Sequence, residues 1–472
     1  MVSALGDNRA AVELCDQTIA IRERLVHQEG RRELADHLAN TYQNKSIAVV
    51  ALGDTRAAVG LCDQAIAIYE RLVHEEGRRE LAYDLANAYQ NKANAVSALG
   101  DNRAALGLYD QAIAIRERLV QQEGRRELAN DLAGSYQSKA IVVGALRDNR
   151  AAVSLFDQAI AIFERLVHQE GRRELANELA RTYTNKCVAV ISLGDNRAAV
   201  ALCDQIIAIR ERLVHQEGRR ELANILATNY VNKAIVAGAL GDNRAAVGVY
   251  DQAIGILEQL VHQEGRSELA KQLADTYQNK ALARIALGDN LAAVGVYDQA
   301  IAILERLVQQ EGRRDLAHDL AKNYMNKAIA VCGLGDNRAA AALFDQAIAI
   351  RERLVQQEGR RELANDLANT YQNKAIVVGA LGDNRAAVGL YDQAIAIYDR
   401  LVHQEGRREL QGDLARVFAF RAISLLNLGE RQRAQTQARA AVTALKAEIS
   451  RTGRADLQKV LSWAANVLKD VL

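Results

Sequence analysis

One asparagine recurs along the chain at a fixed spacing, and its amide could bind another polypeptide. A side-chain amide carries both a donor and an acceptor, so it can pair with a peptide backbone without reading its sequence. Neighbouring helices lie about 8–10 Å apart, and an extended chain advances about 3.3–3.6 Å per residue. One asparagine would therefore hold roughly every third ligand residue. The alternative is that these amides cap or bridge helices. The series is Asn44, Asn91, Asn185, Asn232, Asn279, Asn326 and Asn373.

Three polar positions close to this asparagine differ from copy to copy, whereas most of the repeat is constant. Steps of four and three residues place Asp36, Asn40 and Gln43 on one stripe of a helix. Such variation indicates either a ligand-binding face whose chemistry changes along the array or neutral drift on a solvated face. The residues at these positions that we expect to contact a peptide are Asn40, Asn87, Arg181, Lys322, Gln43, Gln90 and Gln278.

Lysine and histidine also recur, but neither series predicts catalysis or a metal site. We expect the stem of Lys45 to pack and its ammonium to reach a recurrent carboxylate such as Asp16, Asp63 or Asp110. One histidine per copy cannot place several nitrogens within about 2.1 Å of one ion. The Tyr42–Lys45 pair recurs in eight copies, whereas catalysis needs one unique arrangement. No phosphate loop or zinc motif is present, so we expect a non-enzymatic protein without cofactor or metal.

The whole chain repeats every 47 residues, which predicts an array of helix pairs. Between Gly30 and Gly53, apolar residues recur at three- and four-residue steps, which indicates an amphipathic first helix. Gly53 suits the left-handed position after a helix, and Asp54 can cap the next one. A second helix is predicted from about residue 55 to 76, where Gly77 ends it.

Composition narrows the class of partner. The chain has 472 residues, 49% of them hydrophobic, and 60 Lys plus Arg against 59 Asp plus Glu. A net charge of +1 argues against nucleic acid or an acidic membrane as the main partner. No apolar run approaches the length of a membrane span. Five cysteines without paired spacing suggest a reducing compartment, so we expect a cytoplasmic protein.

The copies at the two ends differ from those between them. The chain begins at the end of a first helix and then holds nine first helices, ten second helices and one terminal helix. We expect residues 1–429 to form the repeat array, with the first unit lacking its first helix, and residues 430–472 to form a divergent unit and capping helix. The N-terminal end has no such cap, which favours truncation from a longer protein over packing against another copy.

These residues resemble the tetratricopeptide repeat family. The match consists of an aromatic residue, small residues at fixed offsets and a Leu-Gly-Asp turn, and its residues are Tyr89, Ala93, Val96, Leu99, Gly100, Asp101, Ala105, Tyr109, Ala112 and Ile115. Two features depart from the family: its usual period is 34 residues, and Lys92 stands where a leucine is usual. The longer helices are similar to those of kinesin light chain.

The resemblance implies an all-α, right-handed superhelical solenoid of antiparallel helix pairs with about ten units. In such arrays the variable stripe lines a concave groove, and the asparagine series resembles the groove asparagines of O-GlcNAc transferase and kinesin light chain. We therefore expect a scaffold that binds an extended peptide or disordered segment in this groove. The alternatives are the sensor or scaffold arm of a larger signalling protein, RNA binding by helical repeats, and self-association through the N-terminal end.

Overall fold

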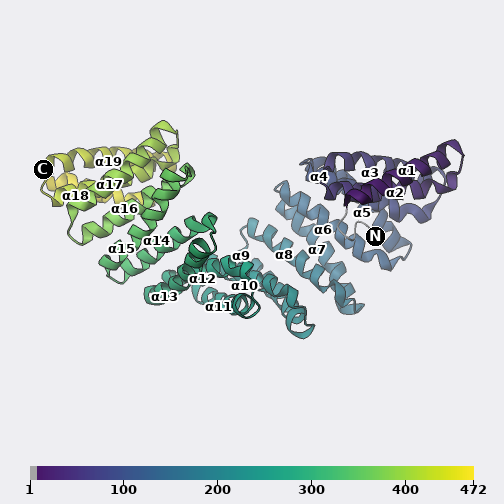
Figure 1. Ribbon diagram of the computed structural model, residues 1–472, viewed down its shortest axis with the longest axis horizontal. Coiled ribbons are helices and arrows are strands. Elements are labelled where there is room, and N and C mark those ends of the chain that lie inside the picture. Colours follow the sequence, from purple (N-terminus) through teal and green to yellow (C-terminus); the bar gives the residue numbers. More distant parts are fainter. Residues whose placement is uncertain (1–7, 472) are drawn as a thin grey trace. The chain divides into compact units, whose positions relative to one another are not determined.

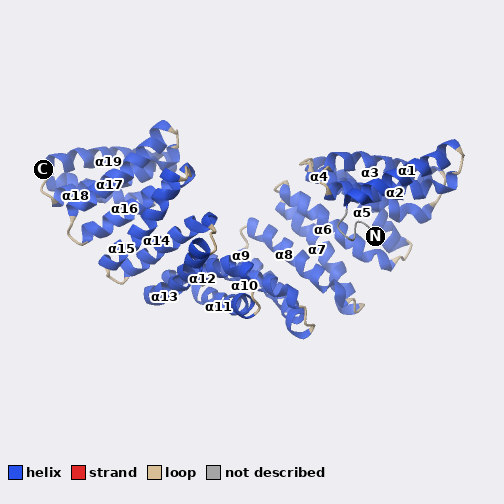
Figure 2. Cartoon of the chain, viewed as in Figure 1, coloured by secondary structure: helices blue, strands red, loops and turns tan. Residues whose placement is uncertain are grey.

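The chain is all-α over residues 8–471, the part that the computed structural model describes. Helices are joined by short loops, and no strand occurs within these residues (Figure 2). Two compact units are present, residues 1–236 and residues 237–472, and each is described by itself. The division falls inside α10 (Ala223–Ala239). The all-α fold of repeating helix pairs is therefore confirmed.

First and second helices alternate along the chain with the register expected from the repeat (Figure 1). The first helices are α10 and, in addition, α2 (Ala35–Ala51), α4 (Ala82–Ala98), α6 (Ala129–Ala145), α8 (Ala176–Ser192), α12 (Ala270–Ala286), α14 (Ala317–Gly333), α16 (Ala364–Ala380) and α18 (Gln411–Asn427). The second helices are α1 (Asn8–Glu23), α3 (Thr55–Glu70), α5 (Asn102–Glu117), α7 (Asn149–Glu164), α9 (Asn196–Glu211), α11 (Asn243–Glu258), α13 (Asn290–Glu305), α15 (Asn337–Glu352), α17 (Asn384–Asp399) and α19 (Arg431–Thr452).

Each turn between a first and a second helix uses the glycine and aspartate of the repeat. Gly53 adopts φ = 90°, a left-handed conformation that costs glycine little. Asp54 then caps α3, because its Oδ1 accepts a hydrogen bond from the backbone N–H of Ala57 at 3.0 Å. Arg147 replaces this glycine in one copy and still adopts φ = 67°. The glycine at the corresponding position of the first copy, Gly6, lies outside the described residues.

The second helices end differently from the sequence expectation. A single α-helix was expected to reach residue 76, but α3 ends at Glu70 and a π-helical turn follows over Arg71–Glu75. The backbone N–H of Glu76 donates to the carbonyl of Arg71 at 3.1 Å, a five-residue step. The same turn closes the other second helices up to α17, and a left-handed glycine such as Gly77 follows it. Helical periodicity does not distinguish one wider turn from an α-helical turn.

Two contacts join each first helix from α2 to α16 to the second helix before it. In the first contact, a buried tyrosine hydroxyl donates to a glutamate 19 residues earlier, as between Tyr183 and Glu164 at 2.5 Å. In the second, a lysine pairs with an aspartate 29 residues earlier, as between Lys45 and Asp16 at 2.5 Å. The expectation that these lysines reach the recurrent aspartates is confirmed. Both contacts tie helices across the loop that carries the π-turn.

The C-terminal end closes with α20 (Asp456–Val471), which packs on α18 and α19. Leu457, Val460 and Ala464 are buried there. The Trp463 ring lies 5.6 Å from the ring of Phe420, which replaces the recurrent asparagine in the last first helix. The last copy therefore uses this position for packing. The role of residues 430–472 as a cap stays a prediction, as do the boundary at residue 429 and the handedness of the array.

Candidate functional site

The recurrent asparagines lie on the exposed side of the first helices. Asn44 and Asn232 are exposed, and Asn91, Asn185, Asn279, Asn326 and Asn373 are half-buried. Asn44 donates to Oδ1 of Asn40 at 2.7 Å, one helical turn away on the same helix. Among the described residues, the side-chain amides of Asn91, Asn185, Asn279 and Asn373 form no hydrogen bond with a neighbouring helix. The alternative that they bridge helices therefore finds no support at these four positions.

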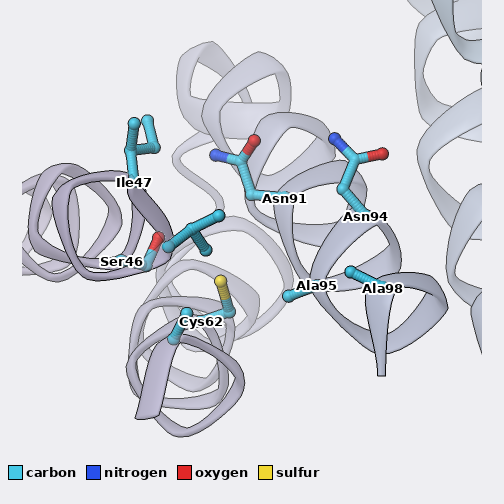
Figure 3. A pocket seen from close by; sticks show the side chains of 9 residues that line it. Ser46, Ile47, Cys62, Asn91, Asn94, Ala95 and Ala98 are labelled. Atoms are coloured by element: carbon cyan, nitrogen blue, oxygen red, sulfur yellow. The ribbon is translucent and has the colours of Figure 1, made fainter. Parts of the chain in front are cut away.

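A cleft opens beside Asn91 between two successive first helices. Its volume is about 350 Å³, and its walls are Ser46, Ile47 and Val50 of α2 with Asn91 and Asn94 of α4. Ala58 and Cys62 of α3 line it from the second helix between them. Figure 3 shows Ile47 on one helix and both amides on the other, with the sulfur of Cys62 between the helices. The cleft thus presents an apolar wall next to two amides.

A second cleft occupies the equivalent place three repeats later in the same unit. It measures about 160 Å³ and lies between α8 and α10, with Asn232 in the register position that Asn91 holds in the first cleft. Val188 occupies the position of Ile47, and Cys203 the position of Cys62. The same juxtaposition of amide and apolar side chains therefore arises from the repeat itself.

Three residues after the asparagine position, most first helices carry an exposed apolar side chain, a row that sequence reasoning missed; Asn94 replaces it in α4, and in α6 Ile141 follows Ser138. Ile47 is 54% exposed and Val188 is 60% exposed, unusually open for aliphatic side chains at a recurring position. A step of three residues places this position on the same helix face as the asparagine. A helical wheel drawn from the asparagine would have shown it. We call these residues the apolar row: Ile47, Ile141, Val188, Ile235, Leu282, Ile329 and Ile376.

One variable position lies on this face as expected. Asn40 and Arg181 are exposed, and Asn87 and Lys322 are half-buried. Arg181 pairs with Glu178 on its own helix at 2.9 Å, so its guanidinium stays at the surface. This position changes between amide, cation, anion and small residues from one copy to the next, beside an asparagine in seven of the nine first helices.

Another variable position lies between helices instead of on the open face. Gln43 and Gln278 are each only 8% exposed. The Gln43 amide donates to the backbone carbonyl of Asp84 at 2.9 Å, and Gln278 accepts from Asn323 at 3.0 Å. Gln90 is half-buried and accepts from the hydroxyl of Ser135 at 2.7 Å. These glutamines join consecutive first helices, so the expectation of a common solvent-facing stripe does not hold for them. Their burial depends on how the next repeat packs, which one helix does not reveal.

Buried arginines approach the same interfaces from the second helices. Arg116 is 4% exposed and donates to Oδ1 of Asn87 at 2.6 Å and to the hydroxyl of Ser135. Arg351 is 1% exposed and donates to the carbonyl of Asp366 at 2.7 Å. Burial lowers the pKa of both guanidinium groups, because the charged form loses hydration. No carboxylate pairs with either of them among the described residues.

The remaining recurrent groups give no sign of a metal site or a membrane span. The recurrent histidines, such as His74 and His168, are exposed near the ends of the second helices. Within residues 8–471, His, Cys, Asp and Glu do not gather in any group that could hold a metal ion. In that same part of the chain, no helix combines the length and apolar character needed to cross a membrane.

This geometry defines an α-helical repeat protein in which most first helices carry an asparagine and an apolar side chain on one face. Three segments match the model of the tetratricopeptide repeat: residues 38–76, 85–124 and 321–359. Each match begins in a first helix and ends after the following second helix. These three segments are therefore tetratricopeptide repeats, as the sequence resemblance indicated.

Solved structures with a similar arrangement share little sequence with this chain. BtubC (BKLC) from P. vanneervenii is 20% identical, with a TM-score of 0.41, and the match covers 53% of this chain and 91% of that one. A putative kinesin light chain with nearly identical TPR-like repeats from Podosopora anserina is also 20% identical, with a TM-score of 0.36, covering 49% and 98%. RapI is 14% identical, with a TM-score of 0.47, covering 85% and 98%. No curated protein matches the sequence.

Proposed function

We propose that the chain is a protein-interaction scaffold that binds an extended peptide or disordered segment along its first helices. Tetratricopeptide repeats are typical of interaction scaffolds; three segments of the chain match their model, and helix pairs of the same kind recur along the described residues. The partner is a polypeptide and not a nucleic acid, because the net charge is only +1. The five free thiols suit a reducing compartment such as the cytoplasm.

The observation that carries the proposal is the combination of unbonded amides with apolar clefts. Asn91 has a free amide in the wall of a cleft that also exposes Ile47. An extended peptide needs both environments, because its backbone requires hydrogen bonds and its apolar side chains require burial. Each amide–backbone bond would contribute about 0.5–1.5 kcal/mol. The variable position at Asn40, Arg181 and Lys322 would then set preferences among ligands.

Exposed amides on the second helices offer a matched control. Gln64 and Gln158 also recur at the 47-residue period and are exposed, but they line neither of the two clefts. Amide chemistry alone therefore does not distinguish the two series. Their surroundings do, because the apolar row lies on the first helices. A member of this row follows six of the seven asparagines by three residues, and Asn91 faces Ile47 of the preceding first helix across the cleft.

The test is selection of peptide ligands from a displayed library of unstructured sequences, followed by affinity measurement. One variant replaces Asn91, Asn185, Asn279 and Asn373 by Ala. The matched control replaces four exposed amides of the second helices by Ala: Gln64, Gln158, Gln252 and Gln346. Because a peptide within one unit would lose two bonds, the asparagine variant should bind at least about fivefold more weakly.

The control variant should bind the selected peptides like the wild type, and both variants should keep the helical circular dichroism of the wild type. Equal affinity of the asparagine variant and the wild type for every selected peptide would refute the role of the asparagines. Failure to select any peptide would refute the scaffold function itself.

A further inference from the structure

Two cysteines face each other inside one helix pair. The Sγ atoms of Cys187 in α8 and Cys203 in α9 lie 3.8 Å apart, and both residues are free thiols. Their side chains are 5% and 3% exposed, so the pair is held in the packed interface between the helices. The two sulfur atoms must approach by about 1.8 Å to form a disulfide bond of about 2.05 Å.

The fold does not need cysteine at either position. The α4–α5 pair holds Ala93 and Tyr109 at the equivalent positions, and both are buried. The α2–α3 pair holds Ser46 and Cys62. Of the helix pairs in the described chain, only α8–α9 therefore brings two thiols together. Packing explains one small side chain facing a larger one, but it does not explain two facing sulfur atoms.

The thiols are accessible to small molecules although they are buried. Both cysteines line the cleft of about 160 Å³ between α8 and α10, together with Val188 and Asn232. Its volume exceeds that of several water molecules, each of which occupies about 30 Å³ in the liquid. A peroxide, which is only slightly larger than water, can therefore reach the sulfur atoms without unfolding of the helix pair.

The two sulfur atoms are not equivalent in acidity. A hydrogen bond from Cys203 stabilises the thiolate of Cys187 and lowers the pKa of Cys187. The same bond, together with burial, raises the pKa of Cys203. Cys187 is therefore the better attacking group, since the thiolate is the nucleophile in thiol oxidation. As a thiol, Cys187 donates instead to the carbonyl of Ala199 at 3.6 Å.

We propose that Cys187 and Cys203 are a modification site, at which a peroxide forms a reversible disulfide between α8 and α9. The Cys187 sulfur attacks one peroxide oxygen, the O–O bond breaks and one water leaves, which yields a sulfenic acid. The Cys203 sulfur then attacks the sulfenic sulfur, and the S–O bond breaks. A second water carries away the oxygen and the proton from Cys203. Two thiols and one hydrogen peroxide thus give one disulfide and two waters.

The crosslink lies next to the recurrent asparagines. Asn185 is two residues from Cys187, and Asn232 lines the same cleft. Oxidation fixes the spacing of α8 and α9 at this point of the array and replaces two thiols in the cleft by a disulfide. A dithiol reductant reverses the reaction by thiol–disulfide exchange.

The experiment treats the folded full-length chain with hydrogen peroxide and then alkylates the remaining thiols in denaturant. Trypsin separates the two cysteines, because it cleaves after Lys186, Arg197 and Arg210. Mass spectrometry should find residues 187–197 joined to residues 198–210, lighter by two hydrogen atoms than the separate peptides, and dithiothreitol should separate them. Cys62, which is buried opposite a serine, should remain alkylated in peptide 57–71.

Two variants use residues that sister copies already carry. Cys187→Ala should abolish the linked peptides and leave Cys203 alkylated, whereas Cys62→Tyr should leave the link intact. The proposal is overturned if Cys187 and Cys203 stay alkylated to the same extent as Cys62 after peroxide treatment. It is also overturned if Cys187 gains oxygen without becoming linked to Cys203.

Discussion

The hydroxyl of Tyr183 donates a hydrogen bond to Oε1 of Glu164 at 2.5 Å, and this contact connects a first helix to the second helix before it. The same pair of residue types, 19 residues apart, recurs in every copy from Tyr42–Glu23 to Tyr371–Glu352. The last copy carries Phe418 opposite Asp399, and Asp399 instead lies 3.5 Å from His403. Tyrosine and glutamate are therefore lost together where the array ends.

Removal of one such hydroxyl should weaken the array locally. We expect Tyr183→Phe to reduce the free energy of unfolding by about 1–2 kcal/mol, because the bond has a charged acceptor. Glu164 is exposed, so water can solvate the carboxylate that loses its donor. Urea denaturation followed by circular dichroism measures the loss. In a double-mutant cycle, Glu164→Gln should add little once Tyr183 is phenylalanine; full additivity would show that the two side chains do not interact.

High pH should destabilise the protein through these tyrosines. Burial and the neighbouring glutamate raise the pKa of Tyr183 above its ordinary value of about 10. Below about pH 10 the phenols are neutral in both states, so their contribution is complete. Above that pH the unfolded phenols ionise first, so the free energy of unfolding falls as the pH rises. Burial alone also raises the pKa of Tyr109 to about 12.

Absorbance at 295 nm and helical circular dichroism, recorded together from pH 9 to 13, test this dependence. Tyrosinate should form at a higher pH than in an unfolded chain, and at the same pH at which the helical signal is lost. Ionisation of most tyrosines near pH 10 with the helices intact would contradict the buried contacts.

The one turn that lacks glycine should be a weak point. Arg147 adopts φ = 67°, a region that costs most residues about 1–2 kcal/mol. Arg147→Gly should therefore stabilise the chain by about 0.5–1 kcal/mol, after the greater unfolded-state entropy of glycine is subtracted. The reverse change, Gly194→Arg, should destabilise the chain by a similar amount. A Cβ at this position meets open space, so the left-handed backbone is the only source of strain. Urea midpoints report both changes; an unchanged midpoint in both variants would exclude backbone strain at this turn.

A leucine should be able to replace a buried arginine that has no carboxylate partner without loss of stability. Arg351 is 1% exposed, and the equivalent positions in two sister copies hold Leu257 and Leu304, which are fully buried. We expect Arg351→Leu to stabilise the chain by about 1 kcal/mol, because desolvation of the charge is no longer required. Thermal and urea denaturation measure the effect. A loss of stability larger than about 1 kcal/mol would mean that the bonds to Asp366 and Thr370 outweigh desolvation.

Sequence periodicity was sufficient to predict the helix pairs, their turns and the positions of the recurrent asparagines on the first helices. Gly53 and Asp54 could be assigned because their roles depend on local backbone geometry alone. The Lys45–Asp16 pair could be anticipated because a long side chain near a buried stripe must place its charge outside. These features depend on one copy and its immediate neighbour.

Other features depend on packing that a single copy does not reveal. Gln43 was expected on the open face, yet the next first helix covers it and accepts its hydrogen bond. The exposure of Ile47 and the approach of Cys187 to Cys203 likewise follow from how helices are spaced in three dimensions. Helical periodicity also does not report the π-turn after Glu70, because one wider turn leaves the apolar pattern almost unchanged.

The central claim is that the asparagines hold a ligand by its backbone, and scanning N-methylation of a selected peptide tests it most directly. Each amide of the peptide is methylated in turn, and the dissociation constant is measured by fluorescence anisotropy. Affinity should fall about two- to tenfold at roughly every third residue, because about 0.5–1.5 kcal/mol is lost where an asparagine binds the backbone. Methylation at the intervening residues should have little effect. A uniform response along the peptide, or sensitivity to its side chains alone, would contradict the account.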